Sequence, residues 1–199
     1  MNFINLFLLL IFFLSSCNNS KDLYPTPRDF PPYGLIIEFS EKIKPETGLI
    51  LGSYGINQGT PKNYQPIHGV ASFSAGFSLT KKQEDEISLA EARTLMVFLV
   101  DSFINEINSS KEIVPLLDVN PFTNNLLDLT LHFKDENRID LGQGIAIIYY
   151  SKGKIKYKGY RIHEYTGRYP ARGEHFTIHE ETYEQALEMI KKQDPSMTL

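Results

Sequence analysis

The sequence contains two histidines four residues apart, His175 and His179, whose type and spacing are typical of metal ligands. On a helix, histidines at this spacing point the same way and can bind one Zn²⁺ ion with a nearby carboxylate. The intervening Phe, Thr and Ile instead favour a β-strand. On a strand, which rises about 3.3 Å per residue, the two imidazoles share a face but stand about 13 Å apart, which is too far for one ion. The sequence therefore predicts no metal site and no cofactor.

The other three histidines are His68, His132 and His163, and none has a serine or aspartate at a spacing that by itself indicates a catalytic triad. A triad is recognised by its geometry and not by chain order, so a dispersed site of histidines and carboxylates stays open. An envelope hydrolase is the alternative function, and a deep pocket lined by two or more of the five histidines would favour it. We assign no catalytic residue and expect a binding protein in preference to an enzyme.

A basic segment lies between residues 152 and 172 of a chain whose net charge is −4. The segment holds seven Lys and Arg residues against a single Glu. Three of its lysines recur at every second position, so on a strand they share one face, and tyrosines are interleaved with them. The predicted binding residues are Lys154, Lys156, Lys158, Arg161, Arg168, Arg172 and Tyr157.

Such a basic surface suits anionic groups, namely lipid headgroups, lipopolysaccharide phosphates, teichoic acids or an acidic protein partner. The competing interpretation is structural, because lysines often protect the edge strand of a sheet against aggregation. The negative charge of the whole chain argues against a nucleic-acid partner.

The N-terminal segment has the pattern of a secretory signal. Residues 3–14 are apolar apart from Asn5. This run is too short to span a bilayer, which needs about 20 helical residues, but it has the length of a signal-peptide core. It is followed by Leu14, Ser15, Ser16 and Cys17, which is the single cysteine of the chain. These four residues resemble the lipobox of bacterial lipoprotein signal peptides.

That resemblance implies that residues 1–16 are removed and that Cys17 is lipidated as the mature N-terminus. Two acyl chains would hold the protein on a membrane of the cell envelope. Asn18, which is not Asp, favours the outer membrane if the organism is Gram-negative. A buried N-terminal element ending in Cys17, or an uncleaved signal anchor, is the alternative. The mature domain resembles no family.

The rest of the chain must position these residues. Residues 17–33 contain four prolines and no regular apolar pattern, which is typical of an extended tether. Residues 34–199 are long enough for one domain. Apolar and alternating runs predict strands at 35–39 and 49–54, joined as a hairpin, and at 69–80, 127–133, 144–151, 154–164 and 174–179.

Two capping boxes mark the expected helices. Ser88 and Glu91 precede a wide apolar stripe that continues to about residue 107, which predicts a long amphipathic helix. Thr182 and Gln185 repeat the spacing and predict a short C-terminal helix. The Lys152-Gly153 dipeptide fits a two-residue hairpin turn. The fold class expected is therefore α+β, with a mostly antiparallel sheet, one long amphipathic helix and a short C-terminal helix.

Overall fold

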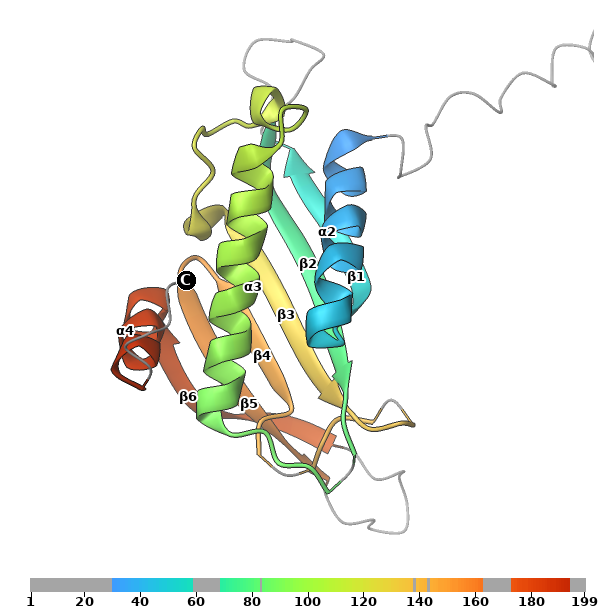
Figure 1. Ribbon diagram of the computed structural model, residues 1–199. Coiled ribbons are helices and arrows are strands. Elements are labelled where there is room, and N and C mark those ends of the chain that lie inside the picture. The colour runs from blue at the N-terminus through green and yellow to red at the C-terminus, as the bar shows by residue number, and fades with distance from the viewer. Residues whose placement is uncertain are drawn as a thin grey trace, which may run out of the picture.

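A computed structural model describes residues 30–58, 69–82, 84–137, 139–142, 144–162 and 173–193. In this part of the chain a six-stranded sheet has its strands in sequence order, β1-β2-β3-β4-β5-β6 (Figure 1). Every neighbouring pair is antiparallel except β2 and β3, which are parallel. The strands are β1 Ile50–Gln58, β2 Val70–Thr80, β3 Leu127–Lys134, β4 Ile147–Ser151, β5 Lys154–Ile162 and β6 Gly173–Thr182. The predicted α+β fold with a mostly antiparallel sheet is confirmed.

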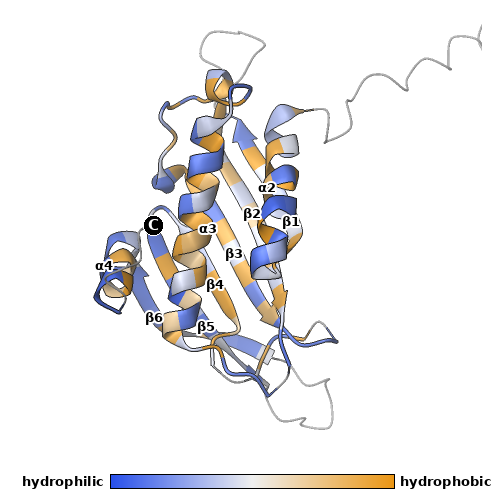
Figure 2. Cartoon of the chain, viewed as in Figure 1, coloured by the Kyte–Doolittle hydropathy of each residue, from blue (hydrophilic) through white to orange (hydrophobic). Residues whose placement is uncertain are grey.

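Three helices accompany the sheet, namely α2 Pro31–Thr47, α3 Leu89–Ser109 and α4 Tyr183–Gln193. Helices α2 and α3 lie over the same face of the sheet, and α4 lies beside β6 (Figure 1). The core fills the space between the sheet and these helices. There the ring of Phe39 from α2 stacks on that of Phe103 from α3, with centroids 4.6 Å apart, and Phe103 also contacts Phe73 of β2. Along β3 hydrophobic residues alternate with hydrophilic ones, and only the hydrophobic ones are buried, whereas β6 is largely hydrophilic (Figure 2).

The two predicted capping boxes set the starts of α3 and α4. The Ser88 hydroxyl accepts a hydrogen bond from the backbone N–H of Glu91 at the start of α3. At α4 the bonds are reciprocal, because the Thr182 N–H donates to the Gln185 side chain and the Gln185 N–H donates to the Thr182 hydroxyl. Both helices, the long amphipathic one and the short C-terminal one, are therefore confirmed.

Helix α2 corrects two expectations. Residues 35–39 are helical and not a strand, and the helix begins at Pro31, so the segment from 31 to 33 is part of the domain and not of a tether. Two prolines open the helix, where a missing N–H costs nothing, and Gly48 ends it with φ at 71°. Its apolar residues Leu35, Ile36, Phe39 and Ile43 recur at helical spacing and are buried against the core.

Several predicted features lie outside the described residues. These are the signal peptide at residues 1–16, the lipidation site Cys17, the tether up to residue 29, and the binding candidates Arg168 and Arg172. Within the described ranges, no helix combines the length and the hydropathy that crossing a membrane requires.

The β4–β5 hairpin brings the lysines into the sheet. Lys152 and Gly153 both have positive φ, 50° and 71°, as a type I′ turn requires, so the predicted two-residue turn is confirmed. The turn fixes the register in which Lys154 pairs with Ser151 and Lys156 with Tyr149. Strand β5 also pairs with β6 on its other side. The lysine-bearing strand is therefore internal, not an edge.

Candidate functional site

The face of the sheet turned away from α2 and α3, called the open face below, carries mostly polar residues in aligned rows. Residues paired across neighbouring strands lie on the same face, so the register defines each row. The middle row crosses all six strands and comprises Ser53, Gly76, Thr130, Tyr149, Lys156 and Glu180. The row on one side comprises Gly55, Ser74, Asp128, Ser151, Lys154 and Thr182. The row on the other side comprises Ile50, Ser78, His132, Ile147, Lys158 and Thr177.

Lys154, Lys156 and Lys158 share the open face, one in each row, as their spacing predicts. Lys156 pairs with Glu180 at 2.9 Å, and both side chains are about half exposed, at 47% and 50%. The Lys158 ammonium lies 5.2 Å from the centre of the Tyr149 ring. Lys154 is exposed and makes no ion pair with any described residue. The edge-strand explanation of these lysines is wrong, because β5 lies between β4 and β6.

Two of the predicted binding residues do not belong to this face. Tyr157 alternates with the lysines and is completely buried on the helix side, at 0% exposure. Arg161 also falls on the helix side of the register, and its guanidinium lies over the Phe176 ring, 4.9 Å from the centroid. The expectation that Tyr157 contacts a ligand is therefore corrected, and Arg161 is separated from the lysines by the sheet.

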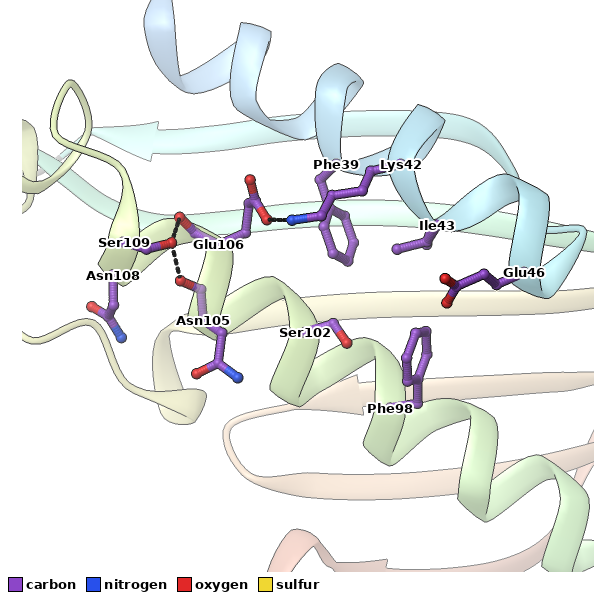
Figure 3. Close-up of a pocket in the computed structure, with 10 residues that line it drawn as sticks. All are labelled: Phe39, Lys42, Ile43, Glu46, Phe98, Ser102, Asn105, Glu106, Asn108 and Ser109. Carbon is purple, nitrogen blue, oxygen red and sulfur yellow. Dashed lines mark hydrogen bonds and ion pairs between the residues drawn. The ribbon is translucent and has the colours of Figure 1, made fainter. Parts of the chain in front are cut away.

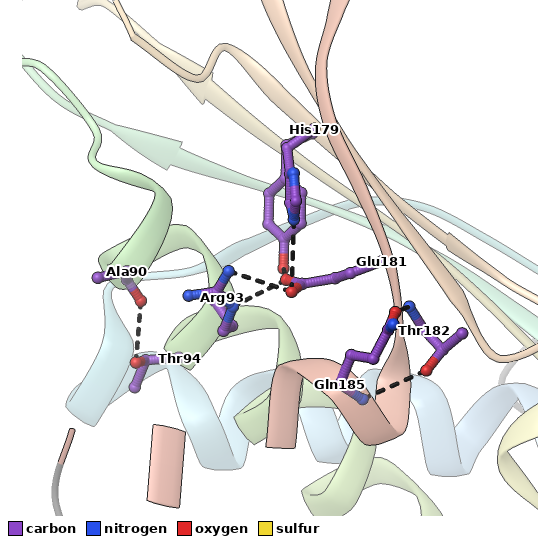
Figure 4. Close-up of polar contacts among 8 residues, drawn as sticks. Ala90, Arg93, Thr94, His179, Glu181, Thr182 and Gln185 are labelled. Carbon is purple, nitrogen blue, oxygen red and sulfur yellow. Dashed lines mark hydrogen bonds and ion pairs between the residues drawn. The ribbon is translucent and has the colours of Figure 1, made fainter. Parts of the chain in front are cut away.

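Tyr157 instead belongs to a buried charged cluster that joins α3 to β6 (Figure 4). Arg93 of α3 donates two hydrogen bonds to Glu181, with its Nε at 2.8 Å and its Nη2 at 3.1 Å. The Tyr157 hydroxyl donates to the same carboxylate at 2.7 Å, and His179 Nε2 lies 3.5 Å from it. The side chains of Arg93 and Glu181 are each only 5% exposed. Only His179 of this cluster is exposed to solvent, at 40%, and the buried groups bind one another, so we assign the cluster a structural role.

The pKa values in this cluster follow from its hydrogen bonds. Burial acts to raise the pKa of Glu181, but hydrogen bonds from Arg93 and Tyr157 outweigh it and hold the pKa below its usual value. Burial and the bond to Glu181 raise the pKa of Tyr157 far above its usual value. The cluster therefore keeps an ionised carboxylate and a neutral phenol.

The two histidines of β6 lie on opposite faces, which corrects the expectation that they share one. The register with β5 shifts between Tyr157 and Lys158, so Ile178 is an extra, bulged residue that reverses the alternation. His179 pairs with buried Tyr157, whereas His175 pairs with Tyr160 on the open face. In the described ranges no group of three His, Cys, Asp or Glu residues is arranged to hold a metal ion.

His175 instead meets His132 across a shared carboxylate, that of Asp140. Asp140 Oδ2 lies 2.8 Å from His175 Nε2, and Oδ1 lies 3.6 Å from His132 Nδ1. Burial acts to raise the pKa of Asp140, but its contacts with the two histidines outweigh it and lower the pKa. The shared carboxylate connects the β3–β4 loop to the start of β6 at one end of the open face.

Three cavities are relevant to the choice between binding and catalysis. An open groove of about 640 Å³ runs between α2 and α3, with Phe39, Ile43 and Phe98 on its floor and the Lys42–Glu106 ion pair at its rim (Figure 3). A second cavity of about 320 Å³ lies beside the β3–β4 loop. A third of about 200 Å³ lies over β1, β2 and β3. None of the three has a histidine in its lining, and His68 and His163 lie outside the described residues.

Comparison with protein-family models, curated proteins and solved structures found no match to this chain. Functional inference therefore depends on the open face and its chemistry.

Proposed function

We propose that the chain is a lipid-anchored cell-envelope protein whose open sheet face binds an anionic polymer of the envelope. The observation that supports this most is the position of the three lysines on an internal strand. An internal strand has both edges paired, so it needs no lysines to prevent aggregation. Their positions in three adjacent rows suit a ligand with repeating anionic groups.

The spacing of the three lysines supports the same ligand class. Successive lysines on one side of a strand stand about 6.6 Å apart, which is within the screening length of about 8 Å at physiological salt. Their potentials therefore overlap, and only Lys156 has a carboxylate partner within the described residues. A flexible polymer with regularly spaced phosphates or carboxylates can contact all three at once.

Reversing the three lysines together, as Lys154→Glu, Lys156→Glu and Lys158→Glu, is expected to weaken binding of an anionic polymer at least tenfold. Each added carboxylate repels the ligand where an ammonium attracted it. The free energy of unfolding is expected to change by less than about 0.5 kcal/mol per site, because these positions are exposed or half-exposed. Isothermal titration with polyphosphate at two salt concentrations, together with urea unfolding, measures both effects.

A matched control is the triple variant Lys44→Glu, Lys111→Glu and Lys191→Glu. It changes the net charge by the same amount at exposed positions that are not on the open face. Equal loss of binding in both variants would show that net charge and not the open face attracts the polymer. Normal binding by the variant with Lys154, Lys156 and Lys158 reversed would contradict the proposal. Selective binding of an acidic protein in place of polymers would indicate a protein partner.

For the anchor, we expect mass spectrometry of the mature protein to find a diacylated Cys17 at the N-terminus. The apolar run that ends in Leu14, Ser15, Ser16 and Cys17 supports this expectation. The Cys17→Ser variant is expected to leave the membrane fraction, because two buried acyl chains contribute about 0.8 kcal/mol per CH₂. The variant Ser20→Ala, just beyond the cysteine, is the control and should stay membrane-bound. An intact precursor with an unmodified cysteine would contradict lipidation.

A further inference from the structure

The smallest of the three cavities is a feature of the open face that the lysines do not explain. It measures about 200 Å³ and is formed where β1, β2 and β3 meet, by Ser53, Ser74, Gly76, Asp128 and Thr130 together with Tyr54 and Ala75. Glycine at position 76 lets the Ser53 hydroxyl lie close to the backbone of β2, because a Cβ there would be only 2.5 Å from the hydroxyl oxygen. The volume is below that of pockets for whole drug-sized ligands, so the cavity suits one unit of a larger molecule.

The polar groups of this cavity are available to a ligand. Ser74 donates a hydrogen bond to the Gly55 carbonyl at 3.2 Å. By contrast, the Asp128 carboxylate and the hydroxyls of Ser53 and Thr130 have no hydrogen-bond partner among the described residues. The hydroxyls can donate or accept, and the carboxylate only accepts. The carboxylate repels phosphate or carboxylate groups and accepts hydrogen bonds from hydroxyls, so the cavity fits an uncharged, hydroxyl-bearing group.

The register connects this cavity to the lysines. Thr130, Tyr149 and Lys156 are neighbours in the middle row, on β3, β4 and β5. Neighbouring strands are about 4.8 Å apart, so the cavity edge at β3 and the lysine-bearing strand β5 are separated by about 10 Å. A ligand that reaches both is therefore longer than a single sugar ring, and it carries hydroxyls at one point and an anion at the next.

We propose that the cavity is a subsite for the uncharged sugar unit of an anionic polysaccharide. This inference builds on the proposed function, in which the lysine strand contacts the polymer's anions. It narrows the ligand from any anionic polymer to one in which neutral and charged sugars follow one another. Discrimination arises because a cavity with unpaired polar groups favours a ligand that supplies hydroxyls over one that does not.

Two probes separate the contributions of charge and hydroxyl. Hyaluronan fragments alternate neutral and carboxylated sugars, whereas polyphosphate carries anions without sugar hydroxyls. Asp128→Ala is expected to weaken hyaluronan binding about tenfold, because a charged acceptor is lost, while it tightens polyphosphate binding by removing a repulsive charge. Thr130→Val, which keeps the side-chain shape, is expected to weaken hyaluronan about fivefold and to leave polyphosphate unchanged. Ser102→Ala, which removes a hydroxyl from α3 on the other side of the sheet, is the control and should change neither.

The outcomes separate this inference from the proposed function. If Asp128→Ala tightens the binding of both hyaluronan and polyphosphate, only the charge of Asp128 matters. The sugar subsite is then overturned, whereas the anion-binding face stands. The same follows if the unsubstituted protein binds polyphosphate but not hyaluronan. If it binds neither probe, the proposed function itself fails. Urea unfolding midpoints equal to that of the unsubstituted protein verify that the variants fold. If Thr130→Val unfolds at lower urea, the test depends on Asp128→Ala alone, which is expected to weaken hyaluronan binding and tighten polyphosphate binding.

Discussion

Replacing Arg93 by Ala is expected to lower the free energy of unfolding by about 3–5 kcal/mol. The substitution leaves the Glu181 carboxylate, which is only 5% exposed, without its cationic partner. The Tyr157 hydroxyl would remain as a donor at 2.7 Å, but a neutral phenol does not neutralise a buried charge. Urea unfolding of the variant at neutral pH, compared with the unsubstituted protein, measures the loss.

Two further variants identify the cause of that loss. The triple variant Arg93→Met, Glu181→Leu and Tyr157→Phe removes both charges together with the hydroxyl that donates to Glu181. It is expected to recover most of the stability, because apolar side chains of similar volume replace a costly buried ion pair. Lys81→Ala breaks a partly exposed ion pair, Lys81 with Glu91 at 3.1 Å, and should cost less than about 1 kcal/mol. A loss below 1 kcal/mol for Arg93→Ala would show that water reaches Glu181 and that the cluster does not hold α3 to β6.

Replacing Phe39 by Ala is expected to cost about 3–5 kcal/mol of stability. Phe39 is 1% exposed, stacks on Phe103 at 4.6 Å and meets the edge of Phe77 at 6.4 Å, so its removal opens a cavity between α2, α3 and β2. Thermal or urea unfolding of the single variant measures the effect. It tests whether α2 is an integral part of the domain.

The neighbouring residue Glu38 provides the control for this prediction. It lies on the exposed side of the same helix, so Glu38→Ala should change stability by less than about 0.5 kcal/mol. If Phe39→Ala behaved like Glu38→Ala, α2 would be a peripheral helix that folds separately from the sheet.

Local patterns in the sequence were sufficient for most of the secondary structure. Alternation predicted β2 and β3, and the capping residues Ser88 and Thr182 located the starts of α3 and α4. The pattern failed at residues 35–39, because three consecutive apolar residues fit a short strand as well as a helix. The helix forms because its apolar positions meet α3 and the sheet, and no local signal reports that contact.

The candidate site was only partly accessible from the sequence for a similar reason. Alternation correctly put Lys154, Lys156 and Lys158 on one face of the strand. The same alternation puts Tyr157 on the opposite face, but Tyr157 was grouped with the lysines because it lies in the same basic, tyrosine-rich segment. The cavity residues Asp128 and Thr130 gave no signal, because their meeting with Ser53 depends on the register of three strands. The bulge at Ile178, which separates His175 from His179, likewise exists only in the pairing with β5.

The single parallel pair in the sheet has a consequence for how the chain folds. Only two residues separate β4 from β5, but 46 residues, 81–126, separate β2 from β3. Closing a loop costs conformational entropy that grows with the logarithm of its length. The pairing of β2 with β3 is therefore more costly to form than the strand pairings on either side of it. Helix α3 lies within the loop and packs on both sides of the junction through Phe103 and Arg93. We expect the folding rate to depend on the docking of α3. That step joins the antiparallel pair β1–β2 to the antiparallel strands β3–β6, and each of these two parts forms from local contacts.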